Sequence, residues 1–215
     1  IIEIDVRITH DGVPVVLHDQ RVDRTTNGAG DVEQMRWDTI QALRLIEADG
    51  VSLSAEHPPS LEAALGLAKG RVLVDLDMKT DQVDAVMAVI QSLDMEDQVF
   101  WFDSDLEVLD RAQALDQDTQ VMPRAYAVED IAPLCARYSP MPVIHIDPGF
   151  NTPETVHAAR ACGARVWINA LGAVDDRLAE GEARALDPLL ISGADIVQTD
   201  HPEAVLSVLE QTGRR

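Results

Sequence analysis

Apolar and polar side chains alternate over residues 1–8, and an alternation with period two predicts a strand with one apolar and one polar face. Glu3 and Asp5 therefore share the polar face. Residues 10–12 have the composition of a chain-reversing turn, and a second extended run follows that ends at His18. A hairpin of this length predicts that His18 returns to the side of the two carboxylates.

The rest of the chain alternates short apolar runs with helical patterns. Residues 31–45 contain a short helical pattern, and Ser60 predicts the N-cap of a helix that ends before Gly70. Apolar runs predict strands at 71–78, 99–103, 119–125, 143–147, 165–169 and 196–200. Amphipathic periodicity predicts helices at 81–93, 104–115, 128–138, 153–162, 176–191 and 202–211.

Together with the opening strand, these runs imply parallel strands joined by crossover helices. An open doubly wound sheet could hold this number of strands, but no Gly-rich dinucleotide-binding or phosphate-loop motif occupies a strand-to-helix turn. The pattern therefore favours an α/β fold, a (β/α)8 TIM barrel whose first strand is missing from these residues. We expect a single barrel domain over residues 1–215, incomplete at its N-terminus.

In such a barrel the chemistry lies at the carboxyl ends of the strands. Asp75, Asp77 and Lys79 alternate with apolar residues and share one strand face, as Glu3 and Asp5 do. Carboxylates gathered from two strands repel by roughly 1 to 4 kcal/mol per close pair. A cation would relieve this repulsion, and oxygen ligands suit Mg²⁺ or Ca²⁺ better than zinc. The alternative is a solvated, acidic strand face.

The first segment also resembles a known family. The pattern E-I-D-V-R-x-T-x-D-G-V-P-V-V-x-H-D runs over residues 3–19, and D-R-T-T-N-G-x-G follows over residues 23–30. This ordered pattern closely resembles the signature of the glycerophosphodiester phosphodiesterase family, a phosphatidylinositol-phosphodiesterase-like TIM barrel. The resemblance implies that Glu3 and Asp5 are metal ligands and that His18 is one of two histidines that act as general acid and base.

The same resemblance assigns roles at later strand ends. The family pattern has a glutamate two positions before a lysine, and Asp77 and Lys79 occupy those positions. Asp77, one methylene shorter, is the expected third metal ligand, and Lys79 is expected to be a catalytic residue that contacts the phosphate. Trp167 resembles the family's strand tryptophan and is expected to bind substrate as an apolar wall, or else to be a core tryptophan. Residues 199–203 resemble the family's closing motif, in which Asp200 is expected to cap the last helix.

The implied activity is the metal-dependent hydrolysis of glycerophosphodiesters to glycerol 3-phosphate and an alcohol. The divalent cation, Mg²⁺ or Ca²⁺, would act as a Lewis acid, Lys79 would stabilise charge and His18 would move protons. The family's second histidine lies in an H-R-G motif on the first strand, which these residues do not contain, and we expect that strand to precede Ile1. Two alternatives stay open: a sphingomyelinase-D-like phosphodiesterase, and a non-catalytic barrel that keeps only metal or phosphate binding.

The amino-acid composition limits the classes of molecule that the protein is expected to bind. With 17 basic and 38 acidic residues the formal net charge is −21, which argues against nucleic acid or an anionic membrane as a partner. No apolar segment reaches the length of a membrane span, so no stable membrane insertion is expected. We expect a small-molecule phosphodiester as the partner and a cytoplasmic location, while the sequence does not specify an oligomeric state.

Several side chains outside the motif carry separate predictions. Cys135 and Cys162 are predicted to be buried free thiols. Arg24 is expected either to assist an anionic substrate or to form a structural salt bridge. His145 and Asp147 share a strand face, as a catalytic or metal-binding pair or as a structural histidine with its partner. The remaining histidines in turn, loop and helix contexts are predicted at the surface: His10, His57 and His157.

Overall fold

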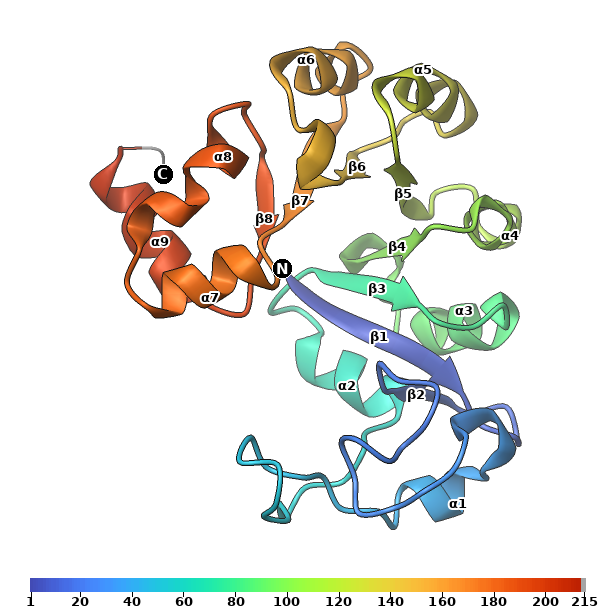
Figure 1. Ribbon diagram of the computed structural model, residues 1–215. Helices are drawn as coiled ribbons and strands as arrows, with labels where there is room; N and C mark the ends of the chain where they lie inside the picture. The colour runs from blue at the N-terminus through green and yellow to red at the C-terminus, as the bar shows by residue number, and fades with distance from the viewer. Residues whose placement is uncertain (214–215) are drawn as a thin grey trace. The chain divides into compact units, whose positions relative to one another are not determined.

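The computed structural model describes residues 1–213. Its contacts gather into two compact units, Ile1–Val121 and Met122–Arg215. In both units strands and helices follow one another along the chain, as the alternating pattern predicts (Figure 1). Within residues 1–213, no helix combines the length and the apolar character that crossing a membrane requires.

A sheet with one antiparallel and two parallel strand pairs lies in the first unit. Strand β1 (Ile2–Ile8) pairs antiparallel with β2 (Pro14–Val16) and parallel with β3 (Val74–Met78), which pairs parallel with β4 (Val99–Asp103). The helices are α1 (Trp37–Ile40), α2 (Leu61–Ala68), α3 (Val83–Ser92) and α4 (Leu106–Leu115), with 3-10 turns at Val32–Gln34 and Glu96–Gln98. Helices α2, α3 and α4 pack against one another in chain order (Figure 1).

Local chemistry explains where these elements begin and which face they bury. The Ser60 hydroxyl accepts a hydrogen bond from the backbone N–H of Ala63 at 3.2 Å, so it caps α2 as predicted. In β3, Val74 and Leu76 are fully buried and Met78 is 4% exposed. Because side chains alternate along a strand, the polar residues of β3 lie on the opposite face.

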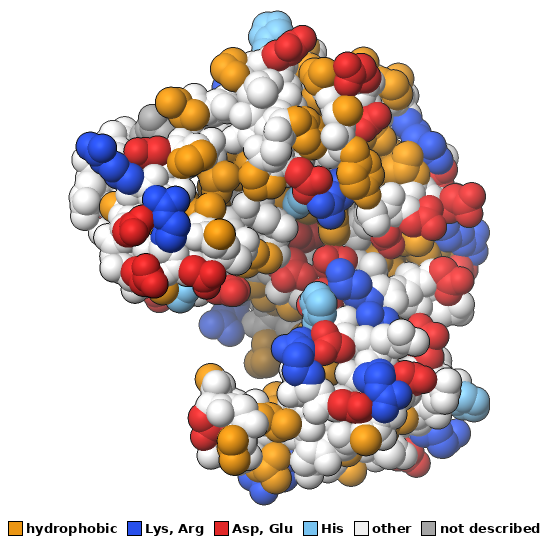
Figure 2. Space-filling view, in the orientation of Figure 1, with side chains coloured by type: hydrophobic (Ala, Val, Ile, Leu, Met, Phe, Trp, Pro, Cys, Tyr) orange, Lys and Arg blue, Asp and Glu red, His pale blue; other side chains and the backbone are white. Residues whose placement is uncertain are grey.

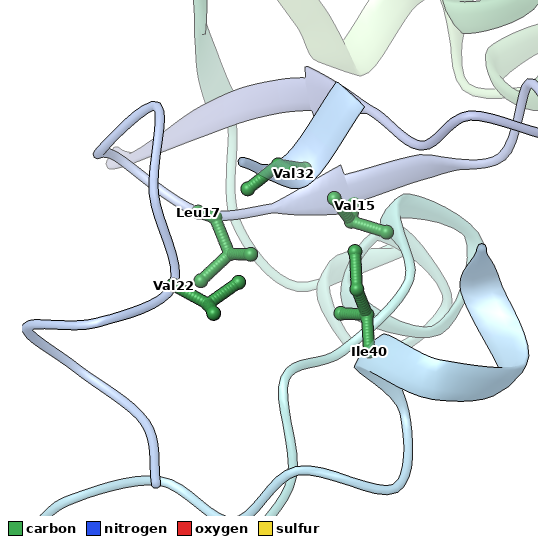
Figure 3. Packing of buried hydrophobic residues seen from close by; sticks show 5 residues of the cluster. All are labelled: Val15, Leu17, Val22, Val32 and Ile40. Atoms are coloured by element: carbon green, nitrogen blue, oxygen red, sulfur yellow. The ribbon is translucent and has the colours of Figure 1, made fainter. Parts of the chain in front are cut away.

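The long segment between β2 and α2 has a small core of its own. Its members are Val15, Leu17, Val22, Val32 and Ile40 (Figure 3). Backbone hydrogen bonds add to this packing, because Val22 donates to the carbonyl of Gly30 at 3.0 Å and Val32 donates to the carbonyl of Gln20 at 2.9 Å. The loop that follows His18 is therefore anchored on both sides although it has little regular secondary structure.

The second unit has a parallel sheet in which each strand pairs with the next strand along the chain. Its strands are β5 (Gln120–Ala125), which begins at the boundary between the units, β6 (Val143–Ile146), β7 (Arg165–Asn169) and β8 (Ile196–Gln198). Its helices are α5 (Val128–Arg137), α6 (Pro153–Ala161), α7 (Ala173–Ala179), α8 (Asp187–Leu190) and α9 (Pro202–Gln211), with 3-10 turns at Pro148–Phe150 and Ala183–Leu186. Strand β7 and helix α9 have the predicted bounds.

Two predictions for this unit are wrong. The single helix predicted over residues 176–191 is divided between α7, a 3-10 turn and α8, because Gly181 adopts a φ of 87°, which ends a right-handed helix. Asp200 does not cap α9, whose N-cap is His201 without a side-chain cap bond. The backbone N–H of Asp200 instead donates to Asp175 at 2.7 Å.

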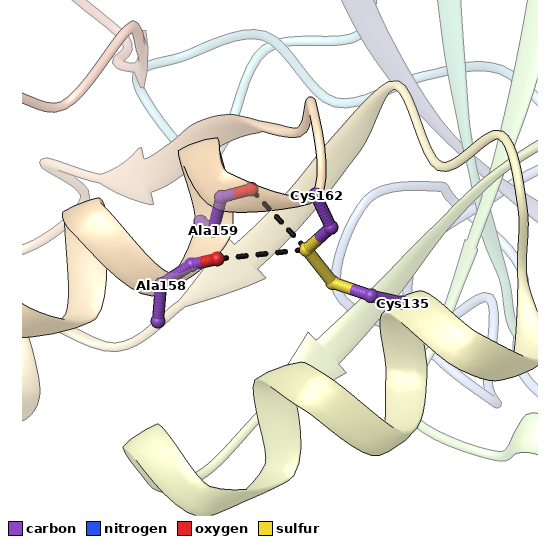
Figure 4. Close-up of a disulfide and its surroundings, with 4 residues drawn as sticks. All are labelled: Cys135, Ala158, Ala159 and Cys162. Carbon is purple, nitrogen blue, oxygen red and sulfur yellow. Dashed lines mark hydrogen bonds between the residues drawn. A yellow bond between two sulfur atoms is a disulfide. The ribbon is translucent and has the colours of Figure 1, made fainter.

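The prediction of free thiols is also wrong. Cys135 on α5 and Cys162 just after α6 form a disulfide, with Cα atoms 6.1 Å apart (Figure 4). Helices α5 and α6 are in contact, so the crossover connections bring together two cysteines 27 positions apart in the chain. Helical periodicity does not show which faces of two helices meet, so the residue pattern could not predict this pairing.

The surface carries charges of both signs. On the face that Figure 2 shows, Lys and Arg side chains are interspersed among Asp and Glu. Exposed ion pairs join some of them, such as Arg177 with Glu182 at 2.8 Å. Each such pair contributes only about 0 to 1 kcal/mol. As predicted, the histidines outside the motif and the strand ends are exposed: His10, His57 and His157.

Candidate functional site

The register of β1 and β3 brings the acidic residues of the two strands together. In this parallel pair Glu3 stands beside Asp75, and Asp5 stands beside Asp77. Because side chains alternate along each strand, all four carboxylates project from one face of the sheet. Lys79 follows on the same face, two positions after Asp77.

Three of these carboxylates are close enough together to bind a single metal ion. One oxygen from each of Glu3, Asp5 and Asp77 lies within 4.8 Å of the other two, and all three residues are half-buried. Lys79 Nζ lies 2.7 Å from Asp77 Oδ1 and 3.4 Å from Asp5 Oδ1. The lysine therefore offsets part of the negative charge of the cluster.

The pKa values show that this lysine does not neutralise the cluster. Burial, together with the charges of Asp5 and Asp77, raises the pKa of Glu3 from 4.5 to about 7. Burial also raises the pKa of Asp77, against the opposing effect of Lys79. These shifts mean that the surroundings disfavour the charged carboxylates.

A divalent cation fits this set of donors. Carboxylate oxygens are the hard ligands that Mg²⁺ and Ca²⁺ prefer, and Glu3, Asp5 and Asp77 offer them from two neighbouring strands. A cation here would favour the ionised form of Glu3, whose pKa is raised by burial and by its acidic neighbours. The structure thus brings together the three predicted ligands in a cluster that could hold a metal ion.

His18 lies at the end of the short β1–β2 hairpin, as the sequence predicts. The backbone N–H of Leu17 donates to the carbonyl of Asp5 at 3.1 Å, which ties the residue before His18 to the acidic strand. His18 is also near enough to Glu3 to interact with it electrostatically. The structure therefore places the predicted acid-base residue on the side of the carboxylates.

Arg24 forms the salt bridge that was one of its two predicted roles. Its Nε and Nη2 donate to the Asp19 carboxylate at 2.6 and 3.0 Å. The same carboxylate lies 2.8 Å from Nδ1 of His18. These hydrogen bonds from Arg24 and His18 hold the pKa of Asp19 far below its usual range.

Arg7 joins the two strand ends that carry the predicted catalytic side chains. Its Nε donates to the backbone carbonyl of His18 at 2.9 Å, and its Nη1 donates to the carbonyl of Lys79 at 3.3 Å. The backbone N–H of Lys79 in turn donates to Val6 at 3.0 Å. Arg7 thereby fixes the separation between the backbones of His18 and Lys79.

Trp167 lies in the second unit, on β7. It is 3% exposed, and its indole N–H donates to Asn169 Oδ1 at 3.3 Å and to Gln198 Oε1 at 3.1 Å. This burial fits the alternative of a core tryptophan. Contact between Trp167 and a substrate stays a prediction.

His145 and Asp147 have structural partners in the second unit. His145 is 3% exposed, and burial and the nearby Arg124 lower its pKa to about 4, although a hydrogen bond with Asn169 opposes this shift. Asp147 accepts a hydrogen bond from Arg124 in an ion pair. This arrangement favours the structural role for the histidine over the metal-binding or catalytic one.

The residue pattern did not predict the contacts that Asp75, Arg7 and Asp19 make at the site. Asp75 is 1% exposed, and burial and the charge of Glu3 raise its pKa well above the usual range. Its place in the alternation D-L-D was visible, but its position beside Glu3 depends on the register between two strands. The contacts of Arg7 and Asp19 likewise depend on the folded course of the chain.

The fold and the site define a class of protein: an α/β protein in which strands alternate with helices and acidic residues gather on two neighbouring parallel strands. A family model described as the glycerophosphoryl diester phosphodiesterase family matches residues 1–125, more than half of the 215 residues. The chain belongs to this family, as the sequence motif predicts.

Curated relatives agree with this assignment. A glycerophosphodiester phosphodiesterase of Caldanaerobacter subterraneus is 38% identical over 80 residues, which cover 37% of this chain and 33% of that protein. The uncharacterized Bacillus subtilis protein YqiK is 26% identical over 236 residues, which cover 97% of this chain and 86% of YqiK. The matches to curated proteins named as glycerophosphodiester phosphodiesterases span a third or less of the length of those proteins.

Solved structures show the fold. A glycerophosphoryl diester phosphodiesterase from Parabacteroides distasonis has a TM-score of 0.82 and 24% identity, covering 98% of this chain and 75% of its own. An Oleispira antarctica phosphodiesterase, solved with the product sn-glycerol-3-phosphate, has a TM-score of 0.81 and 22% identity, covering 97% of this chain and 84% of its own. These likenesses confirm the predicted α/β, TIM-barrel class.

Proposed function

We propose that this protein is a divalent-cation-dependent glycerophosphodiester phosphodiesterase, which hydrolyses a glycerophosphodiester to glycerol 3-phosphate and an alcohol. The observation that carries the proposal is the cluster of Glu3, Asp5 and Asp77 beside Lys79, within the segment that the family model matches. The glycerol 3-phosphate product in the Oleispira antarctica structure supports this class of substrate.

Glu3, Asp5 and Asp77 would hold the cation, Mg²⁺ or Ca²⁺. When bound, this cation supplies Lewis-acid polarisation of the phosphodiester. Lys79, 2.7 Å from Asp77, contributes a second positive charge that would stabilise the negative charge on the phosphoryl oxygens in the transition state. Local positive charge is needed here because the chain as a whole has a formal net charge of −21.

His18 would move protons. Its Nδ1 faces Asp19, which leaves Nε2 to take a proton from the attacking water or to donate one to the leaving alkoxide. Arg7 would keep His18 and Lys79 at a fixed separation through its two backbone contacts. Trp167 is proposed, by resemblance alone, as an apolar contact of the leaving alcohol.

A substrate panel tests this proposal. The protein is stripped of metal with EDTA, supplied with Mg²⁺ or Ca²⁺, and offered glycerophosphocholine, sphingomyelin and lysophosphatidylcholine. We expect glycerol 3-phosphate from glycerophosphocholine, in a reaction that EDTA abolishes and the cation restores. A preference for the two lipids would instead support the sphingomyelinase-D-like alternative, and hydrolysis of none of them would support the non-catalytic one.

A further inference from the structure

The ring of His18 has little packing to hold it in place. Its side chain is 64% exposed, so rotation about the side-chain bonds would move the ring in solvent. One described contact of the ring is with Asp19, whose Oδ1 lies 2.8 Å from Nδ1. The orientation of His18 therefore depends on how firmly Asp19 itself is held.

Asp19 is held by Arg24 in a two-pronged contact. The guanidinium donates to both carboxylate oxygens, from Nε to Oδ2 at 2.6 Å and from Nη2 to Oδ1 at 3.0 Å. A planar fork of this kind fixes the plane of the carboxylate as well as its position. Oδ1 thus receives one hydrogen bond from Arg24 and lies against the ring of His18.

The backbone beneath these residues is also fixed. Leu17, which precedes His18, and Val22, which lies between Asp19 and Arg24, are both buried in the small core of the loop (Figure 3). Arg7 holds the carbonyl of His18 at 2.9 Å. The side-chain contacts therefore start from an anchored backbone, and they can orient the ring instead of following a mobile loop.

We propose that Asp19 and Arg24 are positioning residues for His18, and that they select the tautomer in which Nδ1 carries the hydrogen. A carboxylate can only accept, so Nδ1 donates to Asp19 and the lone pair stays on Nε2. In the proposed reaction Nε2 takes a proton from the water whose oxygen forms the new bond to phosphorus, as the bond from phosphorus to the alcohol oxygen breaks and that oxygen leaves as the alkoxide, which is then protonated. The imidazolium formed on His18 is stabilised by the Asp19 carboxylate. This inference rests on the proposed function for its kinetic consequences, but the tautomer is a property of the protein alone.

Four variants test the proposal kinetically. Asp19→Asn keeps the size of the side chain but lets its amide bond either tautomer. Arg24→Gln removes the fork, and Arg24→Lys keeps the charge but loses the fork. Arg21→Gln is the matched control, because Arg21 forms an ion pair with Asp23 at 2.9 Å in the same loop, and its described side-chain partners are Asp23 and Asp31, not His18 or Asp19.

We expect Asp19→Asn, Arg24→Gln and Arg24→Lys to lower kcat by about 10- to 100-fold on glycerophosphocholine, with KM changed by less than about 3-fold. Arg21→Gln should stay within about 2-fold of the wild type. A rise in KM for Arg24→Gln that Arg24→Lys restores would overturn the proposal, because Arg24 would then attract the substrate through its charge.

Nitrogen-15 NMR of the histidine rings gives a readout that needs no activity. For neutral His18 we expect the hydrogen on Nδ1 in the wild type and in Arg21→Gln, and a shift toward the Nε2-protonated form in Asp19→Asn. An unchanged tautomer in Asp19→Asn would overturn the positioning role. A wild type without diesterase activity but with the Nδ1–H tautomer would refute the proposed function and leave the assignment of the ring intact.

Discussion

Two buried aspartates, one in each unit, are in opposite situations. Asp75 in the first unit is 1% exposed, and among the described residues its Oδ1 has no hydrogen-bond partner. Asp175 in the second unit is 3% exposed, and its two oxygens accept hydrogen bonds from the Thr199 hydroxyl at 2.5 Å and the Asp200 N–H at 2.7 Å. One carboxyl is left in a crowded acidic cluster, and the other connects β8 to α7.

This difference between the two carboxyl groups suggests which polar residues serve function and which stabilise the fold. A buried carboxyl group with an unpaired oxygen and acidic neighbours destabilises a fold, so its presence calls for a role that folding does not explain. The acidic cluster of the first unit is such a case. In the second unit the carboxylates beside the strands are instead paired, as Asp147 is with Arg124 and Asp195 is with Arg160 at 2.8 Å. We therefore propose that catalysis takes place at the acidic face of the first unit and that the paired carboxylates of the second unit stabilise the fold.

The largest expected effect comes from removing a carboxylate of the cluster. Asp77→Asn should lower kcat/KM on glycerophosphocholine by about 10³-fold, or about 4 kcal/mol of transition-state stabilisation. The measurement is a metal-saturated steady-state assay. Asp84→Asn is the control, because Asp84 lies in the same unit but forms an exposed ion pair with Arg111, and its activity should be unchanged. Equal activity in both variants would refute the assignment of catalysis to the cluster.

Reducing the disulfide is the next largest effect, and it concerns stability. Breaking the Cys135–Cys162 bond should lower the free energy of unfolding by about 3 kcal/mol, because it frees a long loop in the unfolded chain. Urea unfolding with and without dithiothreitol measures this change, and the Cys135→Ser/Cys162→Ser variant should not respond to the reductant. Disulfides are rare in cytosolic proteins, so a bond that is fully oxidised when free thiols are alkylated before the cells are broken would oppose the predicted cytoplasmic location.

Replacing each of the two buried aspartates, Asp75 and Asp175, tests the comparison between the units directly. Asp175→Ala should lower the free energy of unfolding by about 2 kcal/mol, because the Thr199 hydroxyl and the Asp200 N–H lose their acceptor. Asp75→Asn should leave the stability of the metal-free protein unchanged or raise it, because it removes a carboxyl from the repulsive cluster. Urea titrations of both variants test this, and a larger loss for Asp75→Asn would reverse the assignment of the two residues.

The last expected effect, spread over a pH range, is a pH dependence of stability. The pKa of Glu3 is about 7 in the folded protein against an ordinary value of 4.5, so between these values the folded state binds more protons than the unfolded state. The stability of the metal-free protein should therefore fall as the pH rises from about 4.5 to 7. The raised pKa values of Asp75 and Asp77 act in the same direction.

Thermal unfolding followed across this pH range checks the sign. Glu3→Gln should reduce the slope, because it removes a carboxyl group whose pKa rises from 4.5 to about 7 on folding. Stability that rises with pH over the same interval in metal-free wild type would contradict the electrostatic account of the cluster.

Much of the fold follows from local patterns in the sequence. Strands β4 and β7 have the predicted bounds because their apolar runs end at clear polar boundaries. The hairpin placed His18 correctly because its turn chemistry is local. The helix predicted over 176–191 failed because amphipathic periodicity continues through a segment in which Gly181 breaks the helical conformation.

The residues of the candidate site also fall into those that local patterns predict and those that depend on the folded structure. Alternation within one strand showed that Glu3 and Asp5 share a face, and the family resemblance added Asp77 and Lys79 to the site. The place of Asp75 beside Glu3 depends on the register between β1 and β3, which a single sequence does not encode in a readable form. The contacts of Arg7 with the backbones of His18 and Lys79 are long-range in the same sense.

The most direct test of the central claim is a calorimetric titration of Mg²⁺ and of Ca²⁺ into the metal-free protein at pH 7.5. We predict saturable binding of one cation per chain to the wild type, with proton release from Glu3, and loss of this binding in Asp5→Asn and Asp77→Asn but not in Asp84→Asn. Binding that is absent in the wild type, or equal in all of these proteins, would contradict a metal site at Glu3, Asp5 and Asp77.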